Sequence, residues 1–180
     1  DSTATMPAGT VFYTTVDDTT FQFSTIASFR KSNIGNIIPF VGVDIYEGTF
    51  ITTRYTVDSS DIDQRFLLTD NRADTSTLIV KVQTSSTDST STTFTEATDI
   101  TQVTSGSNVF FLQEVEAGLF EVYFGDGVIG TALSDDNIVI LTYVVSNKTA
   151  ANGASLFTNA ATIASVTDIS VATAATASAG

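Results

Sequence analysis

Short runs in which apolar and polar side chains alternate recur along the chain, and turn-forming residues separate them. In residues 41–45 and 78–82, for example, every second side chain is apolar. Because successive side chains of a strand point to opposite faces, this pattern predicts half-buried β-strands. The alanine-rich C-terminal part has no amphipathic helical pattern, since Thr, Val and Ser interrupt it. We therefore expect a mainly β fold of antiparallel sheets and hairpins.

The strongest single strand pattern is residues 138–146, IVILTYVVS, which are apolar almost throughout. Such a run predicts a central strand covered on both faces. Polar or glycine-containing corners between strand patterns predict turns and hairpins, here at residues 17–18, 47–48, 70–71 and 116–118. Residues 29–40, with Pro39, are expected to form a loop or edge segment. The Ser/Thr-rich residues 84–99 predict an exposed loop or a hairpin tip.

A chain of 180 residues has room for one domain with a smaller insert. We expect residues 1–40 and 105–160 to form a β-rich domain. Residues 41–104 then form an inserted or middle subdomain that is β-rich or α+β. Residues 161–180 have side chains too small to anchor a core of their own, which predicts an exit strand or a tail.

The composition argues against an enzyme. The chain contains no histidine and no cysteine, which removes the commonest general base and the most easily activated nucleophile. We predict no catalytic residues, no cofactor and no metal site. Three acidic pairs, Asp61 with Asp63, Asp17 with Asp18 and Asp44 with Glu47, leave a carbohydrate-active enzyme as a rival reading. Most acidic side chains are simply solvated, however.

The charge of the chain limits its partners. Twenty acidic residues against seven basic ones give a formal net charge of −13, which repels nucleic acid and anionic lipid. We expect no nucleic acid, membrane or small-molecule substrate as a partner. No apolar run is long enough for a transmembrane helix, and residues 1–10 lack the basic and apolar regions of a signal peptide. The chain begins with Asp1, which suggests a processed chain or an internal fragment of a longer one.

The sharpest local feature is Gly125-Asp126-Gly127, which directly follows an aromatic strand pattern. Aspartate and glycine at such a corner predict a turn that fixes the register of two strands. A phosphate-binding loop would need further glycines, a lysine and a following helix. A calcium site made with Asp135 and Asp136 is the fairer rival, although the spacing fits no EF-hand.

Two further groups of residues are candidates for interfaces. Arg54, Arg65 and Arg72 are three of only seven basic residues and lie close together in the sequence. They are expected to pair with nearby carboxylates, and arginines in an acidic chain are also natural interface anchors. A set of aromatic residues is expected to pack in the core first and to serve an interface second: Phe110, Phe111, Phe120, Tyr123 and Phe124.

Three motifs carry a resemblance to a known family: Pro-Ala-Gly-Thr at residues 7–10, Tyr-Phe-Gly-Asp-Gly at residues 123–127 and Ala-Asn-Gly-Ala at residues 151–154. With them, the chain resembles the baseplate wedge proteins of contractile-tailed, T4-like bacteriophages, in the broad baseplate J-like family. The segments DIYEGTF and QRFLLTDNRADTSTLIVKV resemble the middle region of T4-like members, whereas residues 84–107 match nothing there. The resemblance marks these structural positions: Pro7, Gly9, Tyr123, Phe124, Gly125, Asp126, Gly127, Asn152 and Gly153.

The resemblance implies a structural role. Such a subunit joins neighbouring wedges into the ring around the tail hub, so the expected partners are other wedge proteins and copies of itself. The expected location is the tail baseplate of the virion, after assembly in the host cytoplasm. The chief alternative is a secreted adhesin or surface-layer domain stabilised by calcium, which would share the missing cysteines and the Ser/Thr/Asp richness.

Overall fold

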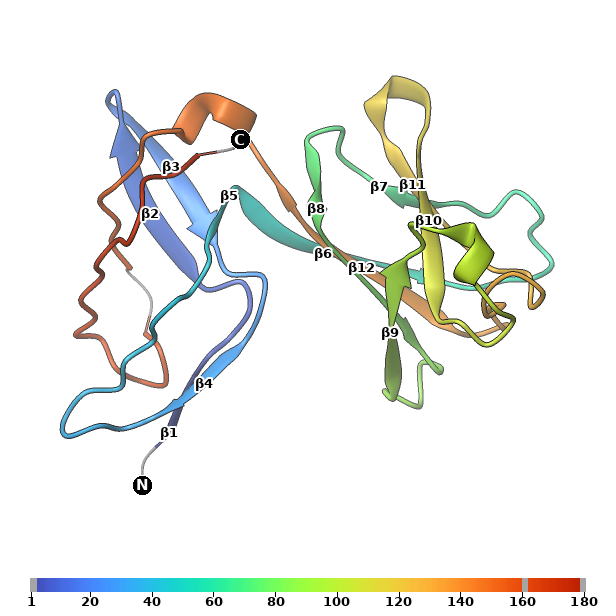
Figure 1. Ribbon diagram of the computed structural model, residues 1–180, viewed down its shortest axis with the longest axis horizontal. Helices are drawn as coiled ribbons and strands as arrows, with labels where there is room; N and C mark the ends of the chain where they lie inside the picture. Colours follow the sequence, from blue (N-terminus) through green and yellow to red (C-terminus); the bar gives the residue numbers. More distant parts are fainter. Residues whose placement is uncertain (1–2, 160–161, 179–180) are drawn as a thin grey trace. The chain divides into compact units, whose positions relative to one another are not determined.

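The computed structural model describes residues 3–159 and 162–178, which form two compact units. Unit 1 is drawn from Asp1–Phe50 and Val144–Gly180, and unit 2 is Ile51–Tyr143. In the described residues, helical structure is limited to three short 3₁₀ turns, η1 (Ile100–Gln102), η2 (Glu116–Gly118) and η3 (Lys148–Ala151). Strands make up the regular structure otherwise (Figure 1), so the predicted mainly β fold is confirmed.

Unit 1 contains two small sheets. In the first, β1 (Thr3–Met6) pairs with β4 (Phe29–Ser32); the second has the order β2 (Val11–Val16), β3 (Thr19–Ser24), β5 (Tyr46–Glu47). The hairpin between β2 and β3 pairs Val16 with Thr19 and leaves Asp17 and Asp18 as a two-residue loop. Both aspartates have positive φ, 47° and 61°, as a type I′ turn requires. The predicted hairpin at residues 17–18 is confirmed.

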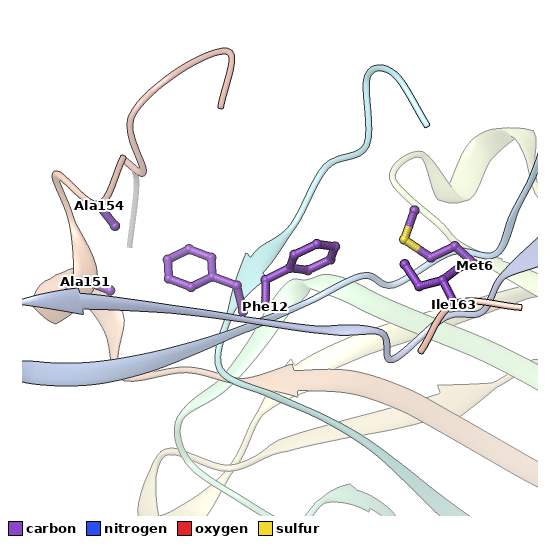
Figure 2. Packing of buried hydrophobic residues seen from close by; sticks show 6 residues of the cluster. Met6, Phe12, Ala151, Ala154 and Ile163 are labelled. Atoms are coloured by element: carbon purple, nitrogen blue, oxygen red, sulfur yellow. The ribbon is translucent and has the colours of Figure 1, made fainter. Parts of the chain in front are cut away.

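The core of unit 1 joins the two ends of the chain. Its buried cluster consists of Met6, Phe12, Phe23, Ala151, Ala154 and Ile163, seen in Figure 2. The ring of Phe157 packs edge-on against Phe23, with centroids 4.9 Å apart. Ala177 exchanges two backbone hydrogen bonds with residues 153 and 154. In the expected tail, residues 161–180, Ile163 thus belongs to this core and Ile169, Val171 and Ala177 pack against it, while the other described residues are exposed. Residues 161, 179 and 180 lie outside the described residues.

Unit 2 is built on one seven-stranded sheet that is nearly closed into a barrel. The order of its strands is β6 (Thr49–Thr56), β12 (Ile138–Val145), β8 (Ala73–Gln83), β9 (Ser91–Glu96), β10 (Val109–Glu114), β11 (Phe120–Phe124), β7 (Phe66–Leu68). β9 and β10 are parallel, whereas β8–β9, β10–β11 and β11–β7 are antiparallel. The core side chains Leu68, Val80, Val139, Leu141 and Tyr143 are fully buried.

Side chains link the two edges of this sheet, β6 and β7. The hydroxyl of Tyr55 on β6 donates a 2.6 Å hydrogen bond to the carbonyl of Leu67 on β7. The hydroxyl of Tyr143 on β12 accepts a 2.9 Å hydrogen bond from the backbone N–H of Thr69, just past β7. An unpaired strand edge invites other chains to pair with it. These contacts occupy backbone groups at the edge.

The unit boundaries differ from those expected from the sequence. β10 pairs with β9, and β11 pairs with β7, so residues 109–124 share a sheet with strands from within 41–104. They therefore belong to unit 2 and not to a domain with residues 1–40. Hydrogen bonding between strands distant in sequence fixes this division, and the local composition carries no trace of it.

Three local predictions need correction. Residues 41–45 do not form a strand: Gly42 has a φ of 68°, which breaks the extended path, and Val41 is 79% exposed. The Ser/Thr-rich segment is not all loop, because residues 91–96 form β9, with Phe94 paired to Val80 and buried. β12 is an interior strand as predicted, but it is not buried throughout: Val139, Leu141, Tyr143 and Val144 are fully buried, whereas its other residues are half-buried.

Candidate functional site

The glycine-aspartate-glycine corner is a tight turn organised by its aspartate. The Asp126 carboxylate accepts hydrogen bonds from the backbone N–H groups of Val128 (2.8 Å) and Ile129 (2.9 Å). A side chain at Gly125 would overlap the carbonyl groups of residues 129 and 130, so only glycine fits there. The amides of Ile129 and Val128 hold the pKa of the Asp126 carboxyl below its ordinary value. The carboxylate is therefore occupied with its own turn.

This corner does not join two neighbouring strands. β11, which precedes it, lies between β10 and β7, while the next strand, β12, lies between β6 and β8. The corner leads the chain out of β11 into a loop that returns for a single bridge between Gly125 and Ala132. The expected turn is present, but the expected hairpin role is wrong, because the strands on either side of the corner are not adjacent in the sheet.

The Pro-Ala-Gly-Thr element connects β1 to β2 through a turn. The carbonyl of Pro7 accepts hydrogen bonds from the N–H (3.3 Å) and hydroxyl (2.7 Å) of Thr10, and Gly9 has a φ of 79°. This is the pattern of a type II turn. The fully buried Thr25 stabilises this turn by two hydrogen bonds: its hydroxyl donates to the Pro7 carbonyl (3.0 Å), and its carbonyl accepts from the Gly9 N–H (2.7 Å). The element therefore fixes the connection between β1 and β2 within unit 1.

The Ala-Asn-Gly-Ala element fixes the C-terminal segment to unit 1. Asn152 ends η3, and its N–H donates to the carbonyl of Thr149 (3.1 Å). The next N–H, that of Gly153, donates to the carbonyl of Ala177 (2.8 Å). The flanking alanines 151 and 154 are buried in the core cluster. Small side chains are needed here because the segment lies directly against the core.

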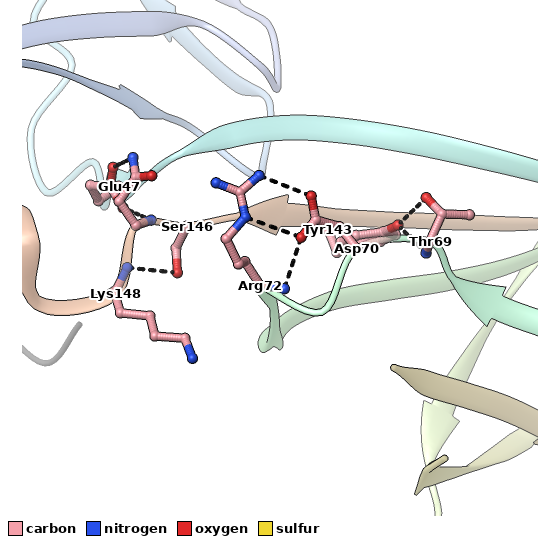
Figure 3. Close-up of polar contacts among 8 residues, drawn as sticks. Glu47, Thr69, Asp70, Arg72, Tyr143, Ser146 and Lys148 are labelled. Atoms are coloured by element: carbon pink, nitrogen blue, oxygen red, sulfur yellow. Dashed lines mark hydrogen bonds and ion pairs between the residues drawn. The ribbon is translucent and has the colours of Figure 1, made fainter. Parts of the chain in front are cut away.

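The three arginines do not converge. Arg65 donates to the buried carboxylate of Glu121 through Nε (2.7 Å), which raises the pKa of the arginine. Arg72 makes a two-pronged contact with Asp70 and lowers the pKa of that carboxyl (Figure 3). Arg54 donates to the side chain of Gln83 (3.2 Å). Two of the three therefore pair with carboxylates, and each contacts a different part of unit 2.

The aromatic residues around the corner divide between core and surface. Phe110 is buried, and Phe124 packs edge-on against Phe66 and Phe94, with ring centroids 5.6 Å and 5.4 Å apart. Tyr123 lies opposite Phe111 in the sheet and is 38% exposed. Phe110 and Phe124 thus belong to the packing of unit 2, whereas Tyr123 is partly exposed.

The acidic pairs are engaged in local structure. Asp17 and Asp18 form the β2–β3 turn, the carboxylate of Asp61 accepts from the N–H of Asp63 (3.1 Å), and Glu47 accepts two hydrogen bonds from Asn147. Within residues 3–159 and 162–178, no group of three or more His, Cys, Asp or Glu side chains is arranged to hold a metal ion. Asp126, Asp135 and Asp136 are thus not gathered into a calcium site.

One shallow cavity of 280 Å³ lies in unit 2. Its lining includes Asp58, Asp61 and Glu121 together with Phe66 and Tyr123.

None of the helices in the described residues has the length and apolar character that a membrane crossing requires.

Residues 52–156 match the family profile described as "Bacteriophage baseplate wedge protein gp6, third domain". The chain belongs to this family. The match spans nearly all of unit 2 and the start of the C-terminal part of unit 1, so it includes the 123–127 and 151–154 motifs and not the 7–10 motif. No curated protein matches the chain.

Sequence reasoning missed several strongly exposed apolar side chains, one inside the matched region and two outside it. Ile62 is 94% exposed, and Ile34 and Ile37 are 71% and 70% exposed. Each stands among polar or turn-forming neighbours, in DID at residues 61–63 and in NIGNI at residues 33–37. A large apolar residue inside a turn-forming segment was the available signal, because such a residue has no sheet face on which to be buried.

Proposed function

We propose that this chain is a structural module of a phage tail baseplate wedge that helps to join neighbouring wedges into the ring around the tail hub. The observation that carries the proposal is the family match over residues 52–156, which takes in all of unit 2 except its first residue, Ile51. We also propose that the chain belongs to the broader baseplate J-like group, from the motifs at residues 7–10, 123–127 and 151–154 taken together. The proposed partners are other wedge proteins and further copies of this chain.

The chemistry of the surface supports an assembly role and not a catalytic one. A glycoside hydrolase needs a carboxylic acid whose pKa is raised. In the described part of the chain, every carboxyl with a shifted pKa has it lowered: Asp58, Asp70, Asp88, Asp99, Asp126 and Asp135. The cause in each case is a hydrogen bond to the charged form from a nearby amide, hydroxyl or arginine. These are the carboxylates of loops and turns.

The location follows from the same proposal. A wedge module is part of the virion, in the tail baseplate, and is built into it in the host cytoplasm before tails are complete. The net charge of −13 suits this role because it keeps free copies soluble until specific contacts form.

The test is immunogold electron microscopy of contractile-tailed particles from the source, with antibody raised against this chain. We expect gold at the baseplate end of the tail, with preimmune serum and antibody preadsorbed on the chain as controls. Label on host cell surfaces with bare baseplates would overturn the proposal and favour an adhesin.

A further inference from the structure

We propose that an exposed hairpin tip of unit 1 binds an acidic loop of unit 2 on a second copy of the chain, in a head-to-tail contact. The proposal rests on the assembly function above and names the surfaces through which copies meet. It starts from exposed apolar side chains in two places. Ile34 and Ile37 lie near basic residues in the sequence, whereas Ile62 lies between two acidic residues.

The first surface, here called the basic tip, is the turn at Ile34 and Ile37 together with the exposed residues that flank it in the chain, Arg30, Lys31 and Val41. Arg30 and Lys31 are consecutive on β4, so their side chains leave the strand on opposite faces. Ile34 and Ile37 face each other across a tight turn, with N–H to carbonyl distances of 2.8 Å and 3.3 Å. Directly opposed residues of an antiparallel pair point to the same face. The two isoleucines therefore form one exposed apolar pair in the turn that follows β4.

Positive charge accompanies this apolar pair. Arg30 and Lys31 are exposed on β4, directly before the turn, and they are two of the three basic residues of unit 1. Arg30 donates a hydrogen bond to the hydroxyl of Thr3 (3.2 Å), an uncharged partner. Val41 adds a further apolar side chain, 79% exposed, shortly after the turn. A surface that is apolar and basic fits a partner that is apolar and acidic.

The second surface, here called the acidic loop, is residues 58–63 of unit 2. Ile62 is 94% exposed and lies between Asp61 and Asp63, which are also exposed. Hydrogen bonds restrain the start of the loop: the N–H of Asp58 donates to the side chain of Gln64 (3.1 Å), and the N–H of Ser59 donates to the carboxylate of Asp135 (2.6 Å). A pre-ordered loop loses little entropy on binding. Ile62 therefore projects into solvent from a loop that is restrained before binding.

Charge complementarity decides which occupant fits the basic tip. Fourteen of the twenty acidic residues and four of the seven basic ones lie in unit 2, which gives it a formal charge of −10. The acidic loop of a second copy offers negative charge and an exposed isoleucine, which complement the positive charge and the exposed isoleucines of the basic tip. The two surfaces differ, so the contact is head-to-tail and generates a ring or a filament instead of a closed pair.

Long-range repulsion opposes this contact, because each copy carries a net charge of −13. The contact is therefore weak between free chains and strong only where other wedge contacts hold copies close together. Such a dependence on local concentration keeps assembly from starting away from the baseplate. A covalent trap is the suitable way to detect it in solution.

The absence of cysteine from the sequence makes single-cysteine trapping clean. Ile37→Cys and Ile62→Cys variants are mixed under mild oxidation, and disulfide-linked dimers are measured by non-reducing electrophoresis and mass spectrometry. Controls of similar exposure are Leu156→Cys in unit 1 (83%) and Val128→Cys in unit 2 (73%). We expect the 37–62 dimer to form about fivefold faster, or more, than any pair that includes a control position.

Several results would overturn the proposal. These are a 37–62 rate no higher than that of the controls, a dominant 37–37 or 62–62 dimer, and an internal disulfide in a chain that carries both cysteines. The last result would mean that the two surfaces meet within one copy.

Charge reversal sharpens the test. The Arg30→Glu/Lys31→Glu change, introduced into the Ile37→Cys chain, is expected to lower the 37–62 trapping rate about fivefold. Mixing it with an Ile62→Cys chain that also carries Asp61→Arg and Asp63→Arg should restore the rate. Failure of the second pair to restore it would refute charge complementarity. Trapping without gold at the baseplate would uphold the contact and overturn the proposed function, whereas gold without trapping would do the reverse.

Discussion

The two units bury their cores by different means. In unit 2, one hydrogen-bonded sheet supplies the whole wall, and side chains such as Leu141 and Val139 are fully buried behind it. In unit 1, short strands and irregular segments from both ends of the chain form the core together, and hydrogen bonds such as those of Thr25 and Ala177 hold the irregular segments in place. Half-buried side chains such as Phe29 border this core, so it has more room to adjust than the fully buried core of unit 2.

The charges differ in the same direction. Unit 2 has a formal charge of −10, and unit 1 has one of −3. All six carboxyls with lowered pKa values, named above, lie in unit 2. The barrel therefore carries both the regular core and most of the acidic surface, whereas unit 1 carries the basic tip.

The largest effect is expected from the barrel core. Leu141→Ala removes a fully buried side chain from β12 and should cost about 2–5 kcal/mol of unfolding free energy. Met6→Ala in unit 1 should cost less, because half-buried neighbours such as Phe29 are free to move into the space. Hydrogen exchange measured by mass spectrometry reports the two units separately. An equal loss for both variants would contradict the contrast between the cores.

The next effect concerns the backbone of unit 1. In Gly48→Ala the new methyl group would overlap the Val145 carbonyl oxygen and lie 2.8 Å from Val144 Cγ1. We expect a loss of about 2–3 kcal/mol, since the strained backbone cannot relax. Gly153→Ala is the control: its φ is also positive, but nothing lies within 4 Å, so only about 1 kcal/mol is expected. Thermal unfolding followed by circular dichroism compares the two, and similar losses would show that the close approach is unimportant.

A smaller effect is expected at the seam of the barrel. Tyr55→Phe removes the hydroxyl that donates to the Leu67 carbonyl and should cost about 1 kcal/mol. Exchange of amides in β6 and β7 should rise, while β8 and β9 stay protected. Tyr13→Phe in unit 1 is the matched control, with no expected change. Unaltered exchange at both edges in the Tyr55 variant would show that the sheet does not need this link.

The smallest effect is expected from acid. Lowered folded pKa values mean that unit 2 gains stability from these carboxylates above the unfolded value of 3.8 and loses it as pH falls through the folded values. Hydrogen exchange below pH 4, corrected for intrinsic rates, should show unit 2 loosening first. Asp126→Asn should remove the part of this dependence that belongs to residues 125–130. Earlier loosening of unit 1 would contradict the assignment.

Much of the fold could be read from local pattern. The two-residue turn at Asp17 and Asp18, the interior position of β12 and the turn after β10 all follow from residue type and period. The motif residues could also be placed on turns, because proline, glycine and aspartate signal backbone geometry directly. The pairing between strands could not be predicted in the same way. The corner at Asp126 is a turn, for example, but the strands on either side of it do not pair.

The sequence by itself determined that this chain is mainly β, acidic, free of histidine and cysteine, and similar to a baseplate wedge protein, because these properties reside in residue identity and short-range order. Only the tertiary structure decided that residues 109–124 belong to the barrel, that Glu121 is buried against Arg65, and that Ile34, Ile37 and Ile62 remain exposed. These are outcomes of pairing between strands distant along the chain. The burial of a side chain depends on which strand lies next to its own, and the order of strands is determined by the pairing of the whole sheet.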